Sequence, residues 1–220
     1  MAKAKKSVKK AAPAAAVKAE RRAGPVKPPQ ASAPKRVVIL LGSPRRKGNS
    51  AALAARIARG AELEKAHVDT FFLHGMKIAP CNACEACHQA GAKGCVIDDD
   101  MQRLYPALRA ADAVVYASPI YWFTVSAQLK AAMDRCYALI GAKGHALAGK
   151  RIGLAFSFGG DDAFDSGCTN AIRTFQDAFA FVGAEITGMV YGSAGAPGAI
   201  KENEKLMDAA EDLGRKLVTG

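Results

Sequence analysis

The stretch "RVVILLGSPRRKGNS", residues 36–50, decides how this chain is organised. Its first part is a continuous apolar run with β-branched residues that ends at Gly42, which predicts a short strand buried on both faces. Its second part offers hydroxyls, three adjacent cations and Gly48, and it leads into a helix predicted over "NSAALAARIARGAEL" with Asn49 or Ser50 as N-cap. A buried strand, a polar loop and a helix in this order are typical of parallel α/β sheets.

Four more strand-like runs follow, separated by helical patterns. They are "HVDTFFL" (67–73), "AVVYASP" (113–119), "RIGLAFSF" (151–158) and "EITGMVYG" (185–192). Strands alternating with helices predict an α/β fold, here a flavodoxin-like three-layer sandwich whose five-stranded parallel sheet has the order 2-1-3-4-5. In such a sheet the ligand binds beyond the carboxyl ends of the strands, between strands 1 and 3. The loops after Gly42 and Ser118 are therefore the candidate site.

The formal net charge of +11 comes almost entirely from the N-terminal segment. Residues 1–36 hold eleven Lys and Arg against one acid, Glu20, in a background of Ala and Pro. Such a segment cannot bury enough apolar surface to offset the entropy of ordering, so we expect residues 1–35 to be a disordered basic tail and residues 36–220 to be the domain. The tail predicts no more than a weak contact with nucleic acid or another polyanion. No run suits a membrane span or an export signal, and the cytoplasm is the expected location.

The loop "GSPRRKGNS", residues 42–50, has the composition of a phosphate site. Backbone N–H groups at a helix N-terminus, the positive end of the helix dipole and a guanidinium all favour an anion. Gly48 allows the backbone to approach that anion closely. The pattern is neither the dinucleotide fingerprint nor the lysine-bearing P-loop. An ordinary capped turn with exposed charges is the structural alternative.

The loop "SPIYWF", residues 118–123, gathers three consecutive aromatic residues, including the single tryptophan, at a strand end. Three large rings there cannot all face the core, so some of their surface is expected to cover a flat ligand or a partner chain. A hydrophobic corner packed on the next helix is the alternative. A phosphate site and an aromatic platform on adjacent loops together indicate flavin mononucleotide, FMN.

These loops resemble those of the NADPH-dependent FMN reductase family. The resemblance rests on G-S-P-R-x-x-G-N-S, on P-I-Y-W-F and on the A-Q-L-K-x-x-M-D-R that follows, and it covers about residues 36–220. It implies FMN as cofactor, NAD(P)H as reductant, a small-molecule electron acceptor and a homodimer or homotetramer. No catalytic side chain is expected, because the flavin carries the hydride chemistry. The family's pattern assigns the FMN phosphate to Ser43, Arg45, Asn49 and Ser50, and the isoalloxazine ring to Pro119, Tyr121, Trp122, Phe123, Gly159 and Gly160.

The run "PCNACEACHQAGAKGC", residues 80–95, holds Cys81, Cys84, Cys87 and Cys95. In a reducing compartment, clustered thiols are more often metal ligands or redox groups than disulfides. Zinc usually takes two separated cysteine pairs or a Cys/His mixture, so one compact run matches it less well. The run resembles that of the iron–sulfur flavoproteins, a branch of the same family, which implies a [4Fe–4S] cluster held by these four residues. Cysteines without metal remain the alternative, and the run is expected beside the flavin edge.

Three functions remain open. The first is an FMN-dependent NAD(P)H oxidoreductase that reduces flavins, quinones or similar acceptors. The second is an electron carrier that holds FMN and a [4Fe–4S] cluster. The third is a flavin-containing interaction protein whose basic tail contacts nucleic acid.

Overall fold

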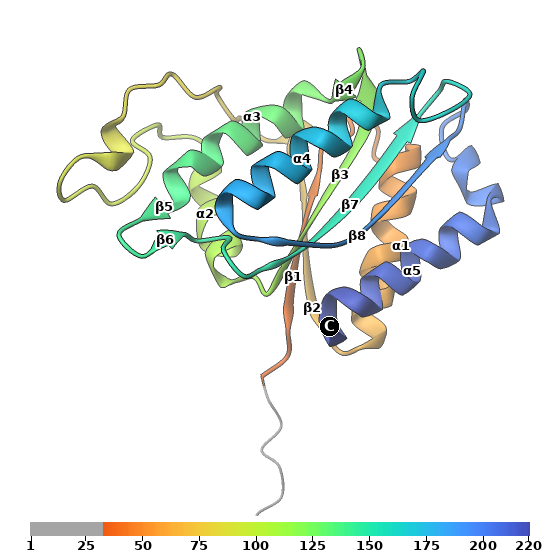
Figure 1. Ribbon diagram of the computed structural model, residues 1–220, viewed down its shortest axis with the longest axis horizontal. Coiled ribbons are helices and arrows are strands. Elements are labelled where there is room, and N and C mark those ends of the chain that lie inside the picture. The colour runs from red at the N-terminus through yellow and green to blue at the C-terminus, as the bar shows by residue number, and fades with distance from the viewer. Residues whose placement is uncertain (1–32) are drawn as a thin grey trace, which may run out of the picture. The chain divides into compact units, whose positions relative to one another are not determined.

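Five parallel strands form a central sheet in the computed structural model, which describes residues 33–220 (Figure 1). The strands are β1 (Arg36–Leu41), β2 (His67–Phe72), β3 (Ala113–Tyr121), β7 (Arg151–Phe158) and β8 (Glu185–Ser193). Their order, β2-β1-β3-β7-β8, confirms the predicted 2-1-3-4-5 arrangement. A two-residue strand, β4 (Thr124–Val125), pairs antiparallel with the end of β3. The predicted tail lies outside the described residues up to position 32, so its disorder stays a prediction.

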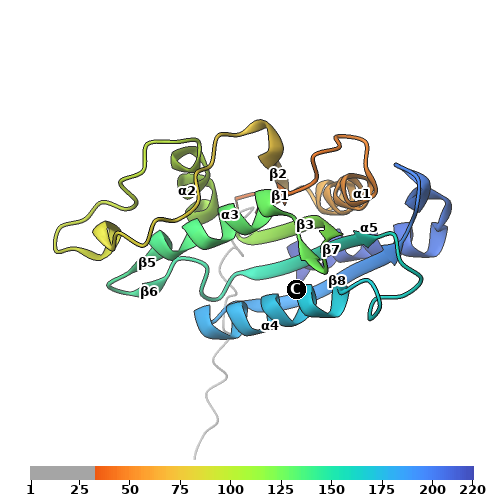
Figure 2. The same ribbon diagram turned by 90° about the horizontal axis from the view of Figure 1, so that it is seen from above.

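Helices cover both faces of this sheet (Figure 2). On one face lie α1 (Asn49–Leu63) and α5 (Glu204–Thr219), and on the other lie α2 (Met101–Ala110), α3 (Ala127–Arg135) and α4 (Cys168–Val182). In β1, Val37 and Ile39 belong to the core under α1 and α5, whereas Val38 and Leu40 belong to the core under the other helices. Successive side chains of a strand point to opposite faces, so an apolar run without alternation needs cover on both.

The backbones of α1 and α5 touch at two glycines. A Cβ atom at Gly60 would overlap the carbonyl of Glu211, and one at Gly214 would overlap the carbonyl of Ile57. Only glycine permits so close an approach. This contact packs α1 against α5, and the short loop after β1 places the N-terminus of α1 near the carboxyl end of that strand.

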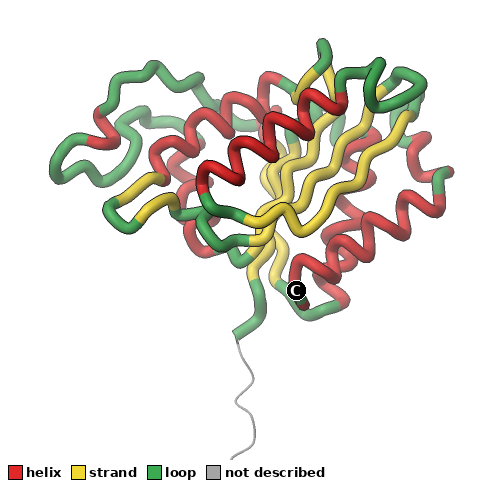
Figure 3. Tube along the Cα trace, in the orientation of Figure 1, coloured by secondary structure: helices red, strands yellow, loops and turns green. Residues whose placement is uncertain are grey.

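The segment between β2 and α2 is almost entirely loop (Figure 3). It contains two short 3₁₀ turns, Leu73–Gly75 and Ala86–His88. After α3 the chain continues through a 3₁₀ turn at Cys136–Leu139 into a small hairpin of β5 (Ile140–Gly141) and β6 (Gly144–His145). A further 3₁₀ turn, Ala199–Glu202, precedes α5. Across residues 33–220, no helix combines the length and the apolarity that crossing a membrane requires.

Candidate functional site

A cavity opens at the carboxyl ends of β1, β3 and β7, where the strand order predicts a ligand site; we call it the strand-end cavity. Seven of the ten predicted cofactor residues line it: Ser43, Arg45, Asn49, Ser50, Pro119, Tyr121 and Gly159. The fold thus brings the polar loop after β1 and the last residues of β3 to one place, since Pro119 and Tyr121, expected in a loop, lie at the end of this strand. Nothing packs near the Cα of Gly159, where a side chain would have open space.

Trp122, Phe123 and Gly160 do not line the strand-end cavity. Trp122 and Phe123 form the two-residue turn between β3 and β4, and both have positive φ, 48° and 66°. Such a turn normally carries Asn and Gly. Here Trp122 is 92 % exposed and Phe123 is 53 % exposed. The two rings lie at the molecular surface, and their contact with a cofactor stays a prediction.

The polar loop after β1 is held by a small hydrogen-bonded turn. Ser43 Oγ accepts from the Arg45 N–H at 3.1 Å and donates to the Arg45 carbonyl at 3.2 Å. The Gly48 N–H donates to the same carbonyl at 3.0 Å. Gly48 stands at the N-cap position of α1, and no side chain caps the helix. The first N–H groups of α1 are therefore available to an anion in the cavity.

Ser50 carries an unused hydroxyl in this cavity. Its side chain is 1 % exposed, and its Oγ has no hydrogen-bond partner among the described residues. A buried hydroxyl without a partner is uncommon, and it indicates a missing ligand. Ser50 lies in the first turn of α1, so a phosphate there would receive the hydroxyl together with the helix N–H groups.

Neither Asn49 nor Ser50 is the N-cap of α1 that the sequence predicts, because Gly48 occupies that position. The predicted contact of Asn49 with the FMN phosphate stays a prediction. The Asn49 side chain makes four hydrogen bonds to residues 194–200, the loop after β8, and does not cap α1. That loop contributes Ala194, Gly195 and Pro197 to the cavity lining. The sequence missed this wall and also missed Ser157, because no local pattern reveals a contact between segments so far apart in the chain.

The four cysteines of the 80–95 run line a second, smaller cavity, together with Arg135 and Tyr137. We call it the cysteine cavity. Among residues 33–220, no three His, Cys, Asp or Glu side chains are placed to share a single metal ion. A four-iron cluster makes a different demand, because each thiolate binds its own iron atom. Four thiols around one cavity fit the chemistry of such a cluster.

The surroundings shift the pKa values of Cys95 and Cys87 in opposite directions. Burial raises the pKa of Cys95, but the Ile97 N–H, the Tyr105 hydroxyl and the Arg135 guanidinium outweigh it and bring this pKa below its ordinary value. Burial, with the neighbouring Cys95 and Glu85 charges, holds the pKa of Cys87 above its ordinary value. Of these two cysteines, Cys95 is therefore the one whose thiolate the surrounding chain stabilises.

The cysteine cavity and the strand-end cavity share no lining residue, and the cysteine cavity includes the last residue of α3, Arg135. The predicted position of the cysteine run beside the flavin edge stays a prediction. Ser126, just before α3, donates to the Gly42 carbonyl at 2.7 Å, whereas Arg135, its last residue, lines the cysteine cavity. At 1.5 Å per residue the helix places Ser126 and Arg135 about 14 Å apart along its axis.

The sequence matches the NADPH-dependent FMN reductase family over residues 35–193. The chain belongs to this family. The match confirms the family and the FMN-dependent oxidoreductase class with NAD(P)H as reductant, and the strand order confirms the flavodoxin-like fold. The roles of individual site residues in this family member remain predictions.

The most similar curated relatives include two iron–sulfur flavoproteins. One, from Archaeoglobus fulgidus, is 42 % identical over 127 residues, which cover 57 % of this chain and 62 % of that protein, just under two thirds of its length. One from Methanosarcina thermophila is 35 % identical over 153 residues, which cover 70 % of this chain and 77 % of that protein. Among solved structures, an NAD(P)H:quinone oxidoreductase from Methanothermobacter marburgensis superposes with a TM-score of 0.65 at 19 % identity, over 84 % of this chain and 98 % of that one. This last likeness concerns the fold.

Proposed function

We propose that this protein is an FMN-dependent NAD(P)H oxidoreductase that passes electrons to a small-molecule acceptor such as a flavin or quinone. The observation that carries the proposal is the unpartnered, buried Ser50 hydroxyl at the uncapped N-terminus of α1, inside the strand-end cavity. A hydroxyl, helix N–H groups and the Arg45 guanidinium together suit the phosphate of FMN.

Different residues of the strand-end cavity would contact the phosphate and the ring of FMN. Ser50 and Arg45 hold the phosphate, and Ser43 keeps the loop in shape. Pro119 and Tyr121 flank the ring, and the bare backbone at Gly159 allows it to lie close. FMN would supply the hydride and electron chemistry between nicotinamide and acceptor. The residues that line the cavity would bind the cofactor and position its ring.

A homodimer or homotetramer is part of this proposal. An apolar groove of about 540 Å³ lies between α3 and α4, and Phe181 at its rim is 82 % exposed. Exposed apolar patches of this kind mark association surfaces in soluble proteins. The cytoplasmic location and a weak polyanion contact of the tail are further predictions, and residues 1–32 of the tail lie outside the described residues.

A second function is favoured by the cysteine cavity: an electron carrier that holds FMN and a [4Fe–4S] cluster. The four cysteines that line this cavity supply the ligand number and type that such a cluster takes. The names of the two archaeal relatives support the same form. We propose Cys81, Cys84, Cys87 and Cys95 as the ligands.

Anaerobic purification with an absorption spectrum and iron and sulfide analysis separates these functions. Resolved flavin bands with rapid NAD(P)H oxidation and no iron indicate the reductase alone. Flavin bands above a broad shoulder that dithionite bleaches, with stoichiometric iron and sulfide, indicate the cluster-containing form. Colourless protein that does not take up added FMN would refute both.

A further inference from the structure

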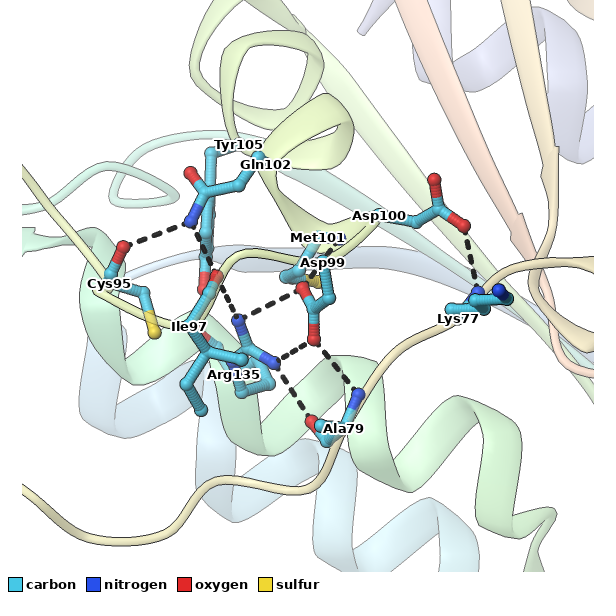
Figure 4. Close-up of polar contacts among 10 residues, drawn as sticks. All are labelled: Lys77, Ala79, Cys95, Ile97, Asp99, Asp100, Met101, Gln102, Tyr105 and Arg135. Atoms are coloured by element: carbon cyan, nitrogen blue, oxygen red, sulfur yellow. Dashed lines mark hydrogen bonds and ion pairs between the residues drawn. The ribbon is translucent and has the colours of Figure 1, made fainter.

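The loop that carries the cysteines is closed at its base by two aspartates (Figure 4). Asp99 accepts the Ala79 N–H at 2.9 Å and the Met101 N–H at 2.9 Å. Asp100 accepts the Lys77 N–H at 2.8 Å, and the Asp100 N–H donates to the Lys77 carbonyl at 3.0 Å. The two ends of residues 80–98, here the cysteine loop, are thus fastened to each other.

Arg135 binds both ends of the cysteine loop from α3. Its guanidinium forms a two-pronged ion pair with Asp99, with Nη1–Oδ2 and Nη2–Oδ1 distances of 2.6 and 3.1 Å. Nη1 also donates to the Ala79 carbonyl at 2.8 Å, and Nη2 reaches the Ile97 carbonyl at 3.5 Å. The side chain is 1 % exposed. The planar fork of arginine permits these contacts together, and a lysine ammonium does not.

One donor of Arg135 is left over. The Nε–H is buried and has no hydrogen-bond partner among residues 33–220. Arg135 lines the cysteine cavity together with all four cysteines. Buried donors are almost always paired, and one without a partner beside a cavity indicates an acceptor that belongs in that cavity.

We propose that Arg135 is a positioning residue of the cysteine site. It sets the distance between the two ends of the cysteine loop, and it keeps its Nε–H available to a sulfur ligand in the cysteine cavity. The proposal rests on the cluster-containing form of the proposed function. Because hydrogen bonds to the sulfurs set the potential of an iron–sulfur cluster, Arg135 would raise the potential as well as hold the loop.

The test uses three variants of the full chain: Arg135→Gln, Arg135→Lys and, as a matched control, Arg173→Gln. Arg173 pairs with Asp177 on the exposed side of α4. Iron, sulfide and FMN are measured after anaerobic purification, and the cluster potential is measured by redox titration. Removing an outer-shell partner typically costs about 10- to 100-fold in metal affinity. We therefore expect Arg135→Gln to lose most of its iron and to keep its FMN.

Arg135→Lys separates the hydrogen bond from the charge. It retains a cation beside Asp99 but lacks the fork and the Nε–H, so we expect intermediate iron content and a more negative cluster potential than wild type. Arg173→Gln should match wild type in every measurement. An Arg135→Lys protein with wild-type iron and wild-type potential would overturn the proposal. If Arg135→Gln fails to fold, as circular dichroism would show, Arg135→Lys alone tests the proposal.

Failure of the cluster function itself has a distinct signature. Wild-type protein that binds FMN but takes up no iron overturns the cluster form, and with it the donor role of Nε–H. Limited trypsin digestion at Lys93, which is exposed within the cysteine loop, then tests whether Arg135 holds this loop closed. Arg135→Gln should be cut there several times faster than Arg173→Gln, and equal rates would overturn the closure as well.

Discussion

Asn49 and Gly198 are joined by a hydrogen bond of 2.8 Å across 149 positions of the sequence, with the Gly198 N–H donating to Asn49 Oδ1. The same oxygen accepts the Ile200 N–H at 3.3 Å, and Nδ2 donates to the carbonyls of Ala194 and Ala196, both at 3.1 Å. A single amide side chain thus fastens the loop after β8 to the start of α1. This loop is one wall of the strand-end cavity.

Asn49→Ala should therefore weaken FMN binding by releasing the cavity wall. It removes four hydrogen bonds, and we expect a loss of about 2–4 kcal/mol in the free energy of unfolding. We also expect FMN affinity to fall at least about tenfold. Urea unfolding and quenching of FMN fluorescence measure the two effects. The control is Asn82→Ala, which removes one exposed hydrogen bond, from the Cys84 N–H at 3.3 Å, away from this cavity. It should leave FMN affinity unchanged and shift the free energy of unfolding by no more than about 0.5 kcal/mol. Unchanged FMN affinity in Asn49→Ala would contradict this role of the wall.

Ser50→Ala should have opposite effects on the empty and the loaded protein. Without FMN, the substitution removes a buried hydroxyl that has no partner, so the free energy of unfolding should rise by about 1 kcal/mol. With FMN, it removes a hydrogen bond to a charged phosphate, and the affinity should fall about 10- to 100-fold. Thermal unfolding without FMN should show a higher melting temperature than wild type, and the rise in melting temperature on adding FMN should be smaller than in wild type. Thr219→Ala, an exposed hydroxyl at the end of α5, should show neither. If Ser50→Ala binds FMN as tightly as wild type, the phosphate is held elsewhere.

His145 should make the folded protein less stable in mild acid. Burial, together with the charge of Arg109, lowers its pKa below the ordinary value of 6.5 although the Cys136 carbonyl opposes this shift. Its Nδ1 accepts the Leu147 N–H at 3.1 Å, which requires a neutral ring. The unfolded chain therefore takes up this proton at a higher pH than the folded chain does, and stability falls as the pH drops below 6.5.

The effect is small, about 1 kcal/mol or less, because the side chain is only half-buried. Urea unfolding of wild type and of His145→Gln, at several pH values from 8 down to the acid at which the protein unfolds, isolates the contribution of His145. The difference in unfolding free energy between the two proteins should shrink as the pH falls. A difference that stays constant with pH would show that His145 does not titrate differently in the two states.

Gly214→Ala should destabilise the protein although alanine is the better helix former. A methyl group at Gly214 would meet the backbone of α1, which cannot move aside, and we expect a loss of at least about 3 kcal/mol. Gly141→Ala is the matched control, because its methyl group would meet nothing closer than 3.9 Å. It should change stability by less than about 0.5 kcal/mol. Equal melting temperatures for the two variants would show that the helices do not touch there.

The sequence reveals those features that local patterns record. The apolar run of β1 predicts burial on both faces, and alternate side chains of this strand do belong to two cores. The strand order confirms the position of the strand-end cavity, because in a parallel sheet the switch point follows from topology alone. The polar loop after β1 and Tyr121 at the end of β3 accordingly line this cavity.

The features that the sequence hides depend on distant contacts or on unusual backbone conformations. Trp122 and Phe123 form a turn with positive φ at both residues although neither is Gly or Asn. The sequence therefore does not indicate this turn, and it shows only that the two residues are aromatic. The cysteine loop lies at the far end of α3 because Arg135 and Asp99 hold it there, 36 positions apart in the sequence. No spacing within the cysteine run indicates that contact.

The reduction of bound FMN by nicotinamide tests the central claim most directly. Protein loaded with FMN and freed of excess cofactor is mixed anaerobically with NADPH, and in a parallel run with NADH, while the flavin absorbance is followed. We expect stoichiometric FMN and complete bleaching of its visible band by at least one of the two nicotinamides. Ser50→Ala should require higher FMN concentrations to reach the same amplitude. A protein that retains FMN but leaves its absorbance unchanged with both nicotinamides would contradict an NAD(P)H oxidoreductase.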